Sequence, residues 1–348
     1  MRHANSAPAA RRAARFSDGA FLSAALAATA LIALVALGAR SWIDRPFAGF
    51  FLRADRTVAA VGRLAWTDVA PGRFYDRTLL AIDGTPIADS DALHRLVAAK
   101  PIGSTFAYTL TDGRSTETVT IPSRRFAASD YWAVFGAYLG SGLCFVLLAI
   151  LAAWLLPPDR VGRSLVFLGS IGGLYMLSSA DLYPPTVSHR AHALATTLLP
   201  PTLLQFALAI GDARGRFARW SLPVAWTLAV VAAISMQVLL GDPTATGWIY
   251  ATCNAALGCA LAAAAIGLAS RVRVAADAAP LVACTAIFGL GVPAVVFLVG
   301  GTLGGIPQNA SATLTFLFPL GMMAALHREQ AGVAFHRKRD VARATRSL

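Results

Sequence analysis

The stretch RTLLAIDGTPI, Arg77–Ile87, carries the clearest strand-and-turn pattern in this chain. Its apolar run Leu79–Ile82 predicts a short strand. Asp83-Gly84 follows directly and predicts a tight turn, because glycine adopts a positive φ without steric cost. The surrounding segment 45–126 has the composition of a water-soluble domain, whereas most of the remaining chain is strongly apolar. We call this segment the island.

The overall composition is that of a membrane protein. Of 348 residues, 56% are hydrophobic and 14% are charged, whereas soluble domains have roughly 25% charged residues. The cysteines lie in apolar runs, which argues against a disulfide framework or a metal site. We therefore predict a polytopic α-helical membrane protein with an inserted α+β domain, and we expect neither a metal nor another cofactor. The cysteines are Cys144, Cys253, Cys259 and Cys284.

Apolar segments predict about eight membrane spans, because roughly 20 apolar residues cross a bilayer. The first is 20–39, after a basic tail at 1–19. A cleaved signal peptide is the alternative for this segment, since Ala36–Ala39 offers small residues. The later spans form a block at 131–326, followed by a basic tail at 327–348. They are Tyr131–Leu156, Ser164–Ala180, Ala191–Ile210, Trp220–Leu240, Trp248–Ser270, Ala279–Gly301 and Asn309–Leu326.

The distribution of basic residues predicts the orientation. Lys and Arg are concentrated in both tails and in alternate loops, at 157–163, 211–219 and 271–273. The short loops on the opposite side hold only Arg190. By the positive-inside rule, both termini are cytoplasmic and the island is extracytoplasmic. The net charge of +12 is thus explained by topology, and we expect no nucleic-acid partner.

The predicted spans carry few polar groups at depth. None has a charged residue in its middle, which disfavours an ion-coupled transporter. Gln205, Gln237 and Asn254 are the strongest polar groups within the spans and are expected to hydrogen-bond between helices rather than to bind a ligand. The pair Gly136 and Gly140 matches the close-packing GxxxG pattern and indicates a helix-packing face, with a homodimer as one possible outcome.

The island is expected to combine strands with one helix. The helix would begin at Ser90, which is a residue type favoured at N-caps, and would bury Leu93, Leu96 and Val97 on one face. A hairpin is expected to turn at Asp112-Gly113. The predicted strands are Thr57–Leu64, Leu79–Ile82, Phe106–Thr111 and Ser115–Ile121.

This order, with the motifs Asp83–Ile87 and Pro101–Gly103, resembles a PDZ domain. The resemblance implies that the island binds the C-terminus of a peptide or protein by adding it to a sheet edge. The loop Pro46–Phe50 would cradle its carboxylate. The segment Arg73–Asp76 departs from the PDZ pattern, so a folded spacer without an open groove is the alternative. The implied peptide-binding residues are Phe47, Gly49, Phe50 and His94.

The whole architecture resembles the N-terminal sensory half of competence-type bacterial sensor histidine kinases. These combine one span, an outer PDZ-like domain and a block of about seven spans. The resemblance implies a protein of the bacterial plasma membrane. The sequence contains no phospho-acceptor histidine region and no ATP-binding segment. We therefore expect a signal-input protein that relays to a separate, kinase-like cytoplasmic partner through the tail 327–348.

Other classes fit less well, and no enzymatic activity is expected. Intramembrane zinc proteases need His-Glu-x-x-His on a span, and the sequence lacks this motif. A rhomboid-type serine protease needs a serine and a histidine at membrane depth. Here Gly169-Ser170-Ile171-Gly172 is a weak match, and we expect no histidine inside a span. A membrane carrier, or an assembly or scaffold factor that uses the PDZ-like domain for docking, remains the alternative function.

Overall fold

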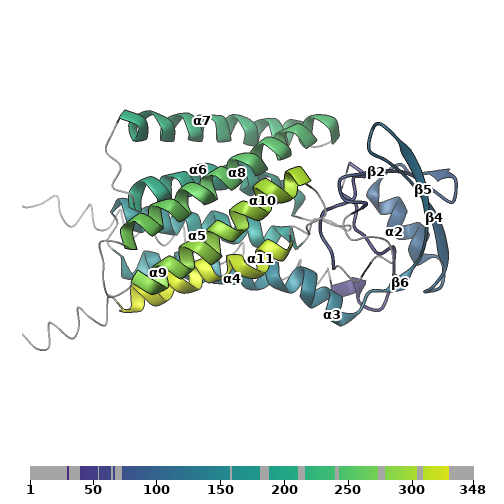
Figure 1. The fold of residues 1–348 in the computed structure, drawn as a ribbon, viewed down its shortest axis with the longest axis horizontal. Coiled ribbons are helices and arrows are strands. Elements are labelled where there is room, and N and C mark those ends of the chain that lie inside the picture. The colour runs from purple at the N-terminus through teal and green to yellow at the C-terminus, as the bar shows by residue number, and fades with distance from the viewer. Residues whose placement is uncertain are drawn as a thin grey trace, which may run out of the picture.

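The computed structural model describes a bundle of long helices with a small sheet-containing domain at one end (Figure 1). The predicted segment 20–39, apart from Ala30, lies outside the described residues, as do the tail 1–19 and the chain after Arg328. The described residues are 30, 40–53, 55–63, 66, 73–156, 159–180, 188–210, 216–239, 243–272, 279–303 and 309–328.

The island contains a four-stranded antiparallel sheet in the order β3-β2-β4-β5. The predicted strand at Leu79–Ile82 is confirmed as part of β2, and the hairpin is confirmed as β4 and β5. The sheet buries alternate side chains such as Phe106, Tyr108 and Leu110 against the island core, as expected for a sheet with one buried face. The strands are β2 (Thr78–Ile82), β3 (Thr85–Pro86), β4 (Thr105–Thr111) and β5 (Thr116–Pro122).

Both predicted turns are present. Asp83 and Gly84 have φ of 49° and 77° and connect β2 to β3, as a two-residue hairpin turn with two positive φ angles requires. The second connection is longer than the predicted Asp-Gly pair, because the last paired residues are Thr111 and Thr116. Within it, Asp112 Oδ1 accepts hydrogen bonds from the backbone N–H groups of Arg114 and Ser115, so the aspartate side chain organises a four-residue loop.

Helix α2 (Ser90–Ala98) lies beside the sheet and begins at Ser90 as predicted, but the residue that caps it is Asp89. Asp89 Oδ1 accepts a hydrogen bond from Ala92 N at 2.7 Å, which satisfies one of the free N–H groups of the first turn. Leu93 and Val97 are buried, whereas Leu96 is 40% exposed. The buried stripe of this short helix is therefore narrower than predicted.

The segment before β2 forms less regular structure than expected. In place of a strand at Thr57–Leu64, its described residues make isolated bridges, between Leu52 and Val58 and between Thr57 and Thr78. A separate two-stranded sheet pairs β1 (Pro46–Phe47) with β6 (Arg124–Arg125). This pairing brings the two ends of the island together next to the helical bundle (Figure 1).

Among the described residues, five helices are long and apolar enough to cross a membrane, namely Ala128–Leu155, Arg160–Ser179, His189–Ile210, Arg219–Leu239 and Ala245–Ala269. The last two predicted spans are also helical, but Cys284–Leu298 is shorter and the final one is interrupted at Phe316. The elements are α3 (Ala128–Tyr131), η3 (Trp132–Gly136), α4 (Ala137–Leu155), α5 (Arg160–Ser179), α6 (His189–Ile210), α7 (Arg216–Leu239), α8 (Pro243–Val272), α9 (Ala279–Ala286), η4 (Ile287–Gly291), α10 (Val292–Leu303), α11 (Asn309–Thr315) and a helix at 317–328.

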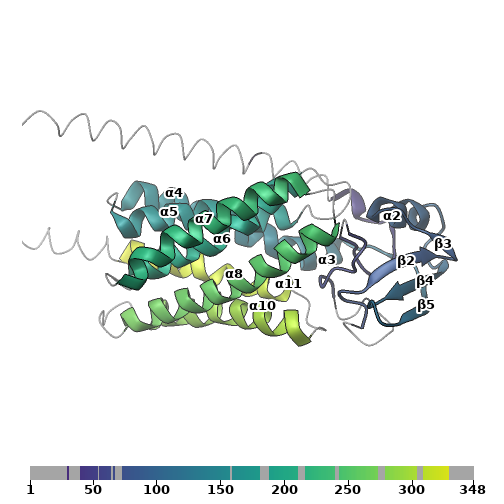
Figure 2. The same cartoon turned by 90° about the horizontal axis from the view of Figure 1, so that it is seen from above.

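Helix α6 occupies the middle of the bundle and contacts α5, α7 and α8. In α6, 61% of the most apolar stretch is buried inside the protein, compared with 17% in α7. Figure 2 shows the helices running side by side with the island at one end. The predicted interhelical role of Gln205 and Gln237 is confirmed: Gln205 accepts from Trp226 Nε1 at 3.1 Å, and Gln237 Nε2 donates to Arg190 O at 3.0 Å.

Glycine allows α4 and α5 to approach closely, but not through the glycines that the sequence favoured. A Cβ on Gly169 of α5 would lie 2.7 Å from Phe145 O and from Ala149 N of α4. A Cβ on Gly140 would have nothing within 4 Å, and one on Gly136 would meet Trp132 of the same helical segment. Gly136 and Gly140 therefore do not pack α4 against another described helix, and their role in a dimer remains a prediction.

Candidate ligand-binding pocket and its contact with the helices

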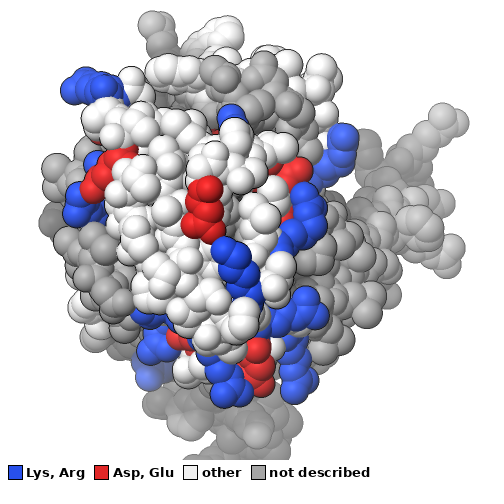
Figure 3. Space-filling model, turned by 90° about the vertical axis from the view of Figure 1, so that its right-hand side faces the viewer, with Lys and Arg blue, Asp and Glu red and all other residues white. Residues whose placement is uncertain are grey.

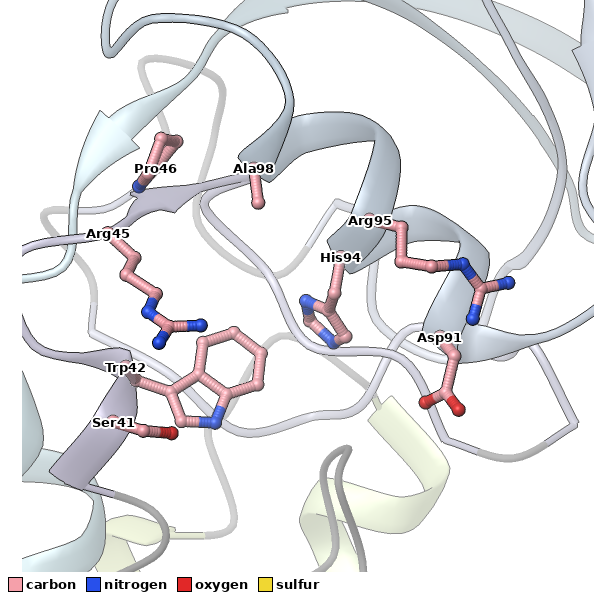
Figure 4. A pocket seen from close by; sticks show the side chains of 8 residues that line it. All are labelled: Ser41, Trp42, Arg45, Pro46, Asp91, His94, Arg95 and Ala98. Carbon is pink, nitrogen blue, oxygen red and sulfur yellow. The ribbon is translucent and has the colours of Figure 1, made fainter.

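A pocket of about 300 Å³ lies between α2 and the segment that leads into β1. One wall is helix α2, and the other is formed by the short helix η1 (Arg40–Trp42) and the start of β1. Figure 4 shows Trp42 and Arg45 from one wall and His94 from the other pointing toward one another. Its lining residues are Ser41, Trp42, Arg45, Pro46, Asp91, His94, Arg95 and Ala98.

His94 is the predicted site residue that lines this pocket. Its imidazole packs edge-on against the indole of Trp42, with 4.2 Å between the ring centroids. The Nε2 atom is enclosed and has no hydrogen-bond partner among the described residues. Burial lowers the pKa of His94 to about 4, because a charged imidazole loses its hydration there. The ring is therefore neutral near pH 7.

The charged residues of the pocket are mostly basic. Figure 4 shows the guanidinium of Arg45 extending toward the indole of Trp42, opposite His94, whereas Arg95 points away from Trp42. Arg95 lies 3.7 Å from Asp89 in an exposed ion pair, so part of its charge is already matched. The acidic group of the lining is Asp91. The region between Trp42, Arg45 and His94 thus offers hydrogen-bond donors next to an aromatic surface.

The other three predicted site residues, Phe47, Gly49 and Phe50, do not line the pocket. Phe47 is buried, with its ring centroid 4.9 Å from that of Trp66, and Phe50 packs 5.1 Å from Tyr108 in the island core. Gly49 has φ of 89°, and a Cβ there would lie 3.3 Å from Trp66 O. Glycine is needed here for the backbone conformation. Contact of these three residues with a peptide stays a prediction.

An aromatic cluster connects the pocket to the bundle. We call the rings of Trp42, Phe47, Phe51, Trp66, Phe126 and Phe135 the junction cluster. Trp42, which lines the pocket, lies 5.6 Å from Phe51, and Phe51 lies 5.8 Å from Phe135. Phe135 belongs to the π-helical turn η3, inside the candidate span Ala128–Leu155. A continuous set of packed rings therefore runs from the pocket wall into a helix that is long and apolar enough to span a membrane.

Polar contacts hold the island on the bundle beside this cluster. Asn309, at the start of α11, forms two hydrogen bonds with Gly62 of the island. Its Oδ1 accepts from Gly62 N and its Nδ2 donates to Gly62 O, each at 3.1 Å. An amide that pairs with both polar groups of one peptide residue fixes position and orientation together. These bonds join residues separated by 247 positions in the chain.

Asp130 provides the second polar contact of the junction. It lies in α3 and accepts hydrogen bonds from Arg63 at 2.6 Å, from Trp66 Nε1 at 3.1 Å and from Ala127 N at 2.9 Å. The carboxylate is buried, and its charge is compensated by Arg63. A buried carboxylate with several donors is stabilising only while these partners remain in place. The sequence predicts a span that begins at Asn309 but gives no indication of these contacts.

The helical bundle contains a serine–histidine pair that the sequence analysis did not predict. His192 lies within α6, so the expectation that no histidine occurs in a span was wrong. Its Nδ1 lies 3.1 Å from Ser178 Oγ, and Ser178 also donates to Leu174 O at 2.6 Å. Both side chains are buried. Because the hydroxyl proton of Ser178 already bonds to the carbonyl of its own helix, the pair has the geometry of a structural contact.

The outer end of the island carries a mixed surface. Figure 3 shows a largely uncharged face with acidic and basic side chains near its centre and further charged side chains around its rim. Some charged side chains of the island form ion pairs with one another. Arg77 lies 2.8 Å from Glu117, which also pairs with Arg73. In the part of the chain that the structure describes, no group of three or more metal-ligating side chains occurs.

Comparison with known proteins gives no assignment. No family model matches this chain, and neither a curated protein nor a solved structure gives a significant match. Functional inference therefore rests on the pocket, the junction and the arrangement of the helices.

Proposed function

We propose that this chain is a receptor-like membrane protein that receives a signal outside the cell and passes it to a cytoplasmic partner. Its PDZ-like island binds the end of an external peptide or protein in the pocket between α2 and η1. The observation that carries this proposal is the position of Trp42. This residue lines the pocket and belongs to the same packed cluster as Phe135 of a membrane-spanning helix.

The proposed orientation rests on the charge distribution. The island lies on the extracytoplasmic side, and both termini lie in the cytoplasm, because the basic loops and tails alternate with nearly uncharged ones. Five membrane-competent helices support a multi-pass arrangement. Exposed tryptophans support it further, since Trp132, Trp154, Trp220 and Trp248 all lie close to the ends of their helices, as in interfacial belts.

The junction gives the proposed relay a physical route. Since Asn309 and Asp130 join the island to α11 and α3, a displacement of Trp42 by a ligand would be transmitted through packed side chains rather than absorbed by a loose tether. Packed interfaces respond to small shifts by moving between discrete arrangements. The basic segment 327–348 is the proposed contact for a kinase-like output protein.

Peptide titration of the full-length protein in nanodiscs tests the binding step. Ala98→Trp places a large ring in the pocket lining and is expected to weaken peptide binding at least about tenfold, because the indole occupies the ligand volume. Ala99→Trp, one residue further and outside the lining, is the matched control. Equal affinity of both variants and the parent protein would place the peptide site elsewhere.

Co-purification tests the output step. The full chain is expected to retain a kinase-like cytoplasmic protein, and deletion of 331–348 is expected to release it. If the same deletion leaves all partner proteins bound, the tail is not the output contact. Capture of other membrane proteins through the weakly packed helix α7 would instead favour the assembly-factor alternative.

A further inference from the structure

We propose that the pocket takes the anionic end of an apolar ligand, a carboxylate or phosphate next to an apolar group, and that His94 takes up a proton when this ligand binds. The inference rests on the proposed function and specifies its ligand. The anionic group would meet Arg45 and the Nε2 atom of His94, and the apolar group would meet Trp42. A peptide C-terminus and a lipid headgroup are two sources of this chemistry.

The arrangement of donors supports an anionic ligand. Arg45 extends into the pocket opposite His94 (Figure 4). The Nε2 atom of His94 is enclosed and has no hydrogen-bond partner among the described residues, and a buried polar atom without a partner is unfavourable. The indole of Trp42 lies between Arg45 and His94 in Figure 4, so an anionic oxygen that displaces this indole would reach both residues. Such charge-assisted hydrogen bonds are stronger than neutral ones.

The apolar part of the lining limits the size of the ligand. Trp42, Pro46 and Ala98 provide uncharged surface next to the donors. A volume of about 300 Å³ is at the lower end of the range for small-molecule pockets. The pocket therefore fits the terminal group of a chain with one adjacent apolar group, and not a long peptide segment.

The strand beside the pocket is poorly suited to extended peptide binding. Strand β1 has two residues, Pro46 and Phe47, and pairs with β6. Proline has no backbone N–H, so β1 lacks one of the donors that an added strand would need. Recognition by the side chains of Arg45, His94 and Trp42 replaces recognition by a backbone ladder. This differs from the mode that the PDZ resemblance implies.

The surroundings of His94 explain the proton uptake. The charged groups that line its pocket are Arg45, Asp91 and Arg95, while the nearby Asp44 is engaged by Arg125 at 2.7 Å. Without ligand, burial keeps the imidazole neutral, with a pKa of about 4. An anion at Nε2 favours the charged imidazolium and raises this pKa. By linkage, ligand affinity rises as pH falls toward the pKa of the bound state.

Calorimetric titration of the full chain in zwitterionic nanodiscs tests this inference. The probes are a short apolar peptide with a free C-terminal carboxylate and the same peptide with a C-terminal amide. The free acid is expected to bind about tenfold more tightly at pH 5.5 than at pH 7.5, because the bound anion raises the pKa of His94. It is also expected to take up protons, seen as a dependence of the heat on the buffer. The amide is expected to bind weakly at both pH values.

Substitutions of the pocket residues test whether the ligand binds there. Arg45→Gln is expected to weaken binding of the free acid at both pH values, whereas His94→Gln should remove its pH dependence. Arg114→Gln, in the exposed loop between β4 and β5 and outside the pocket lining, is the matched control and should retain affinity and pH dependence. Unchanged circular dichroism and thermal unfolding of each variant exclude misfolding. Binding that is unaffected by both Arg45→Gln and His94→Gln would overturn the inference.

The experiment distinguishes a peptide end from a lipid headgroup as the ligand. It also distinguishes failure of the anionic site from failure of peptide sensing. Nanodiscs containing phosphatidylglycerol should compete with the peptide if a lipid headgroup occupies the pocket, and should not compete if the ligand is a peptide end. Equal binding of the acid and amide peptides would refute the anionic site but leave peptide sensing intact. If no peptide of either form binds while phosphatidylglycerol does, in an Arg45-dependent manner, peptide sensing fails and the anionic site stands. Absence of both would refute both proposals.

Discussion

At the scale of single residues, the island is held to the bundle by a small number of buried polar contacts. Asn309 pairs with both backbone groups of Gly62, and Asp130 receives Arg63 and the indole of Trp66. Such contacts matter less for their net energy than for the cost of leaving a buried partner unsatisfied. They therefore determine where the island sits more strongly than they determine whether it folds.

Asn309→Ala removes both hydrogen bonds to Gly62. We expect a destabilisation of about 1–3 kcal/mol, because the backbone groups of Gly62 lose their partners in a buried setting. Thermal unfolding in detergent and hydrogen exchange at residues 58–63 measure it. Asn309→Asp keeps an acceptor for Gly62 N but loses the donor to Gly62 O, and should be intermediate if the aspartate is tolerated. Unchanged exchange in the alanine variant would show that the contact does not hold the island.

The neutral state of His94 makes stability depend on pH. Its folded pKa of about 4 is below the ordinary value of about 6.5, so between these values the unfolded chain binds more protons than the folded one. Stability contributed by this residue is complete above about pH 6.5 and is lost as pH falls toward 4, by at most about 1.4 kcal/mol per pH unit. Denaturation at several pH values measures the slope, which His94→Gln should reduce.

At the scale of elements, close helix contact depends on which glycines face a neighbour. The GxxxG spacing at Gly136 and Gly140 identifies small residues on α4, but Gly140 faces open space. The contact between α4 and α5 instead uses Gly169, whose missing side chain leaves room for the backbone of α4. Spacing along one helix cannot distinguish these cases, because it contains no information about the partner helix.

Gly169→Leu should therefore disrupt the bundle. The added side chain would meet backbone atoms of α4, which cannot move without separating the helices, and overpacking of this kind costs about 1–3 kcal/mol or more. The expected result is a lower yield of folded protein and a lower unfolding temperature. Gly140→Leu, whose Cβ has nothing within 4 Å, is expected to leave the monomer fold intact. A shift of Gly140→Leu from dimer to monomer in size analysis would support the predicted dimer face.

At the scale of the whole molecule, the arrangement is an island docked on a helical bundle with α6 near its centre. The junction cluster, rather than a linker, forms much of the boundary between these two parts. The packing of these side chains therefore fixes how the island is oriented relative to the bundle. The proposed orientation relative to the membrane is a separate matter and rests on the distribution of basic residues.

Cysteine accessibility tests this topology. In a background without the native cysteines, Thr118→Cys on β5 should react with a membrane-impermeant maleimide in intact spheroplasts. His327→Cys, at the opposite end of the bundle, should react only after permeabilisation. Both side chains are exposed in the structure, so a difference in labelling reports the side of the membrane. Labelling of His327→Cys alone in intact spheroplasts would reverse the proposed orientation.

The sequence by itself determined the features that depend on local chemistry. Apolar length indicated the membrane-competent helices, Asp83-Gly84 predicted its turn, and alternation predicted the hairpin of β4 and β5. These patterns are readable because the side chain and backbone preferences act within a few residues. Irregular segments such as Thr57–Leu64 were missed, since propensity alone does not show which backbone groups find a partner strand.

Only the tertiary structure decided the site and its connection to the bundle. It placed Trp42 and Arg45 opposite His94, buried Phe47 and Phe50 away from the pocket lining, and paired Gly62 with Asn309 across 247 positions. Contacts between segments so far apart depend on how whole elements pack, and no local periodicity records that packing. The RTLLAIDGTPI stretch thus determined a strand and a turn, whereas long-range packing determined the pocket.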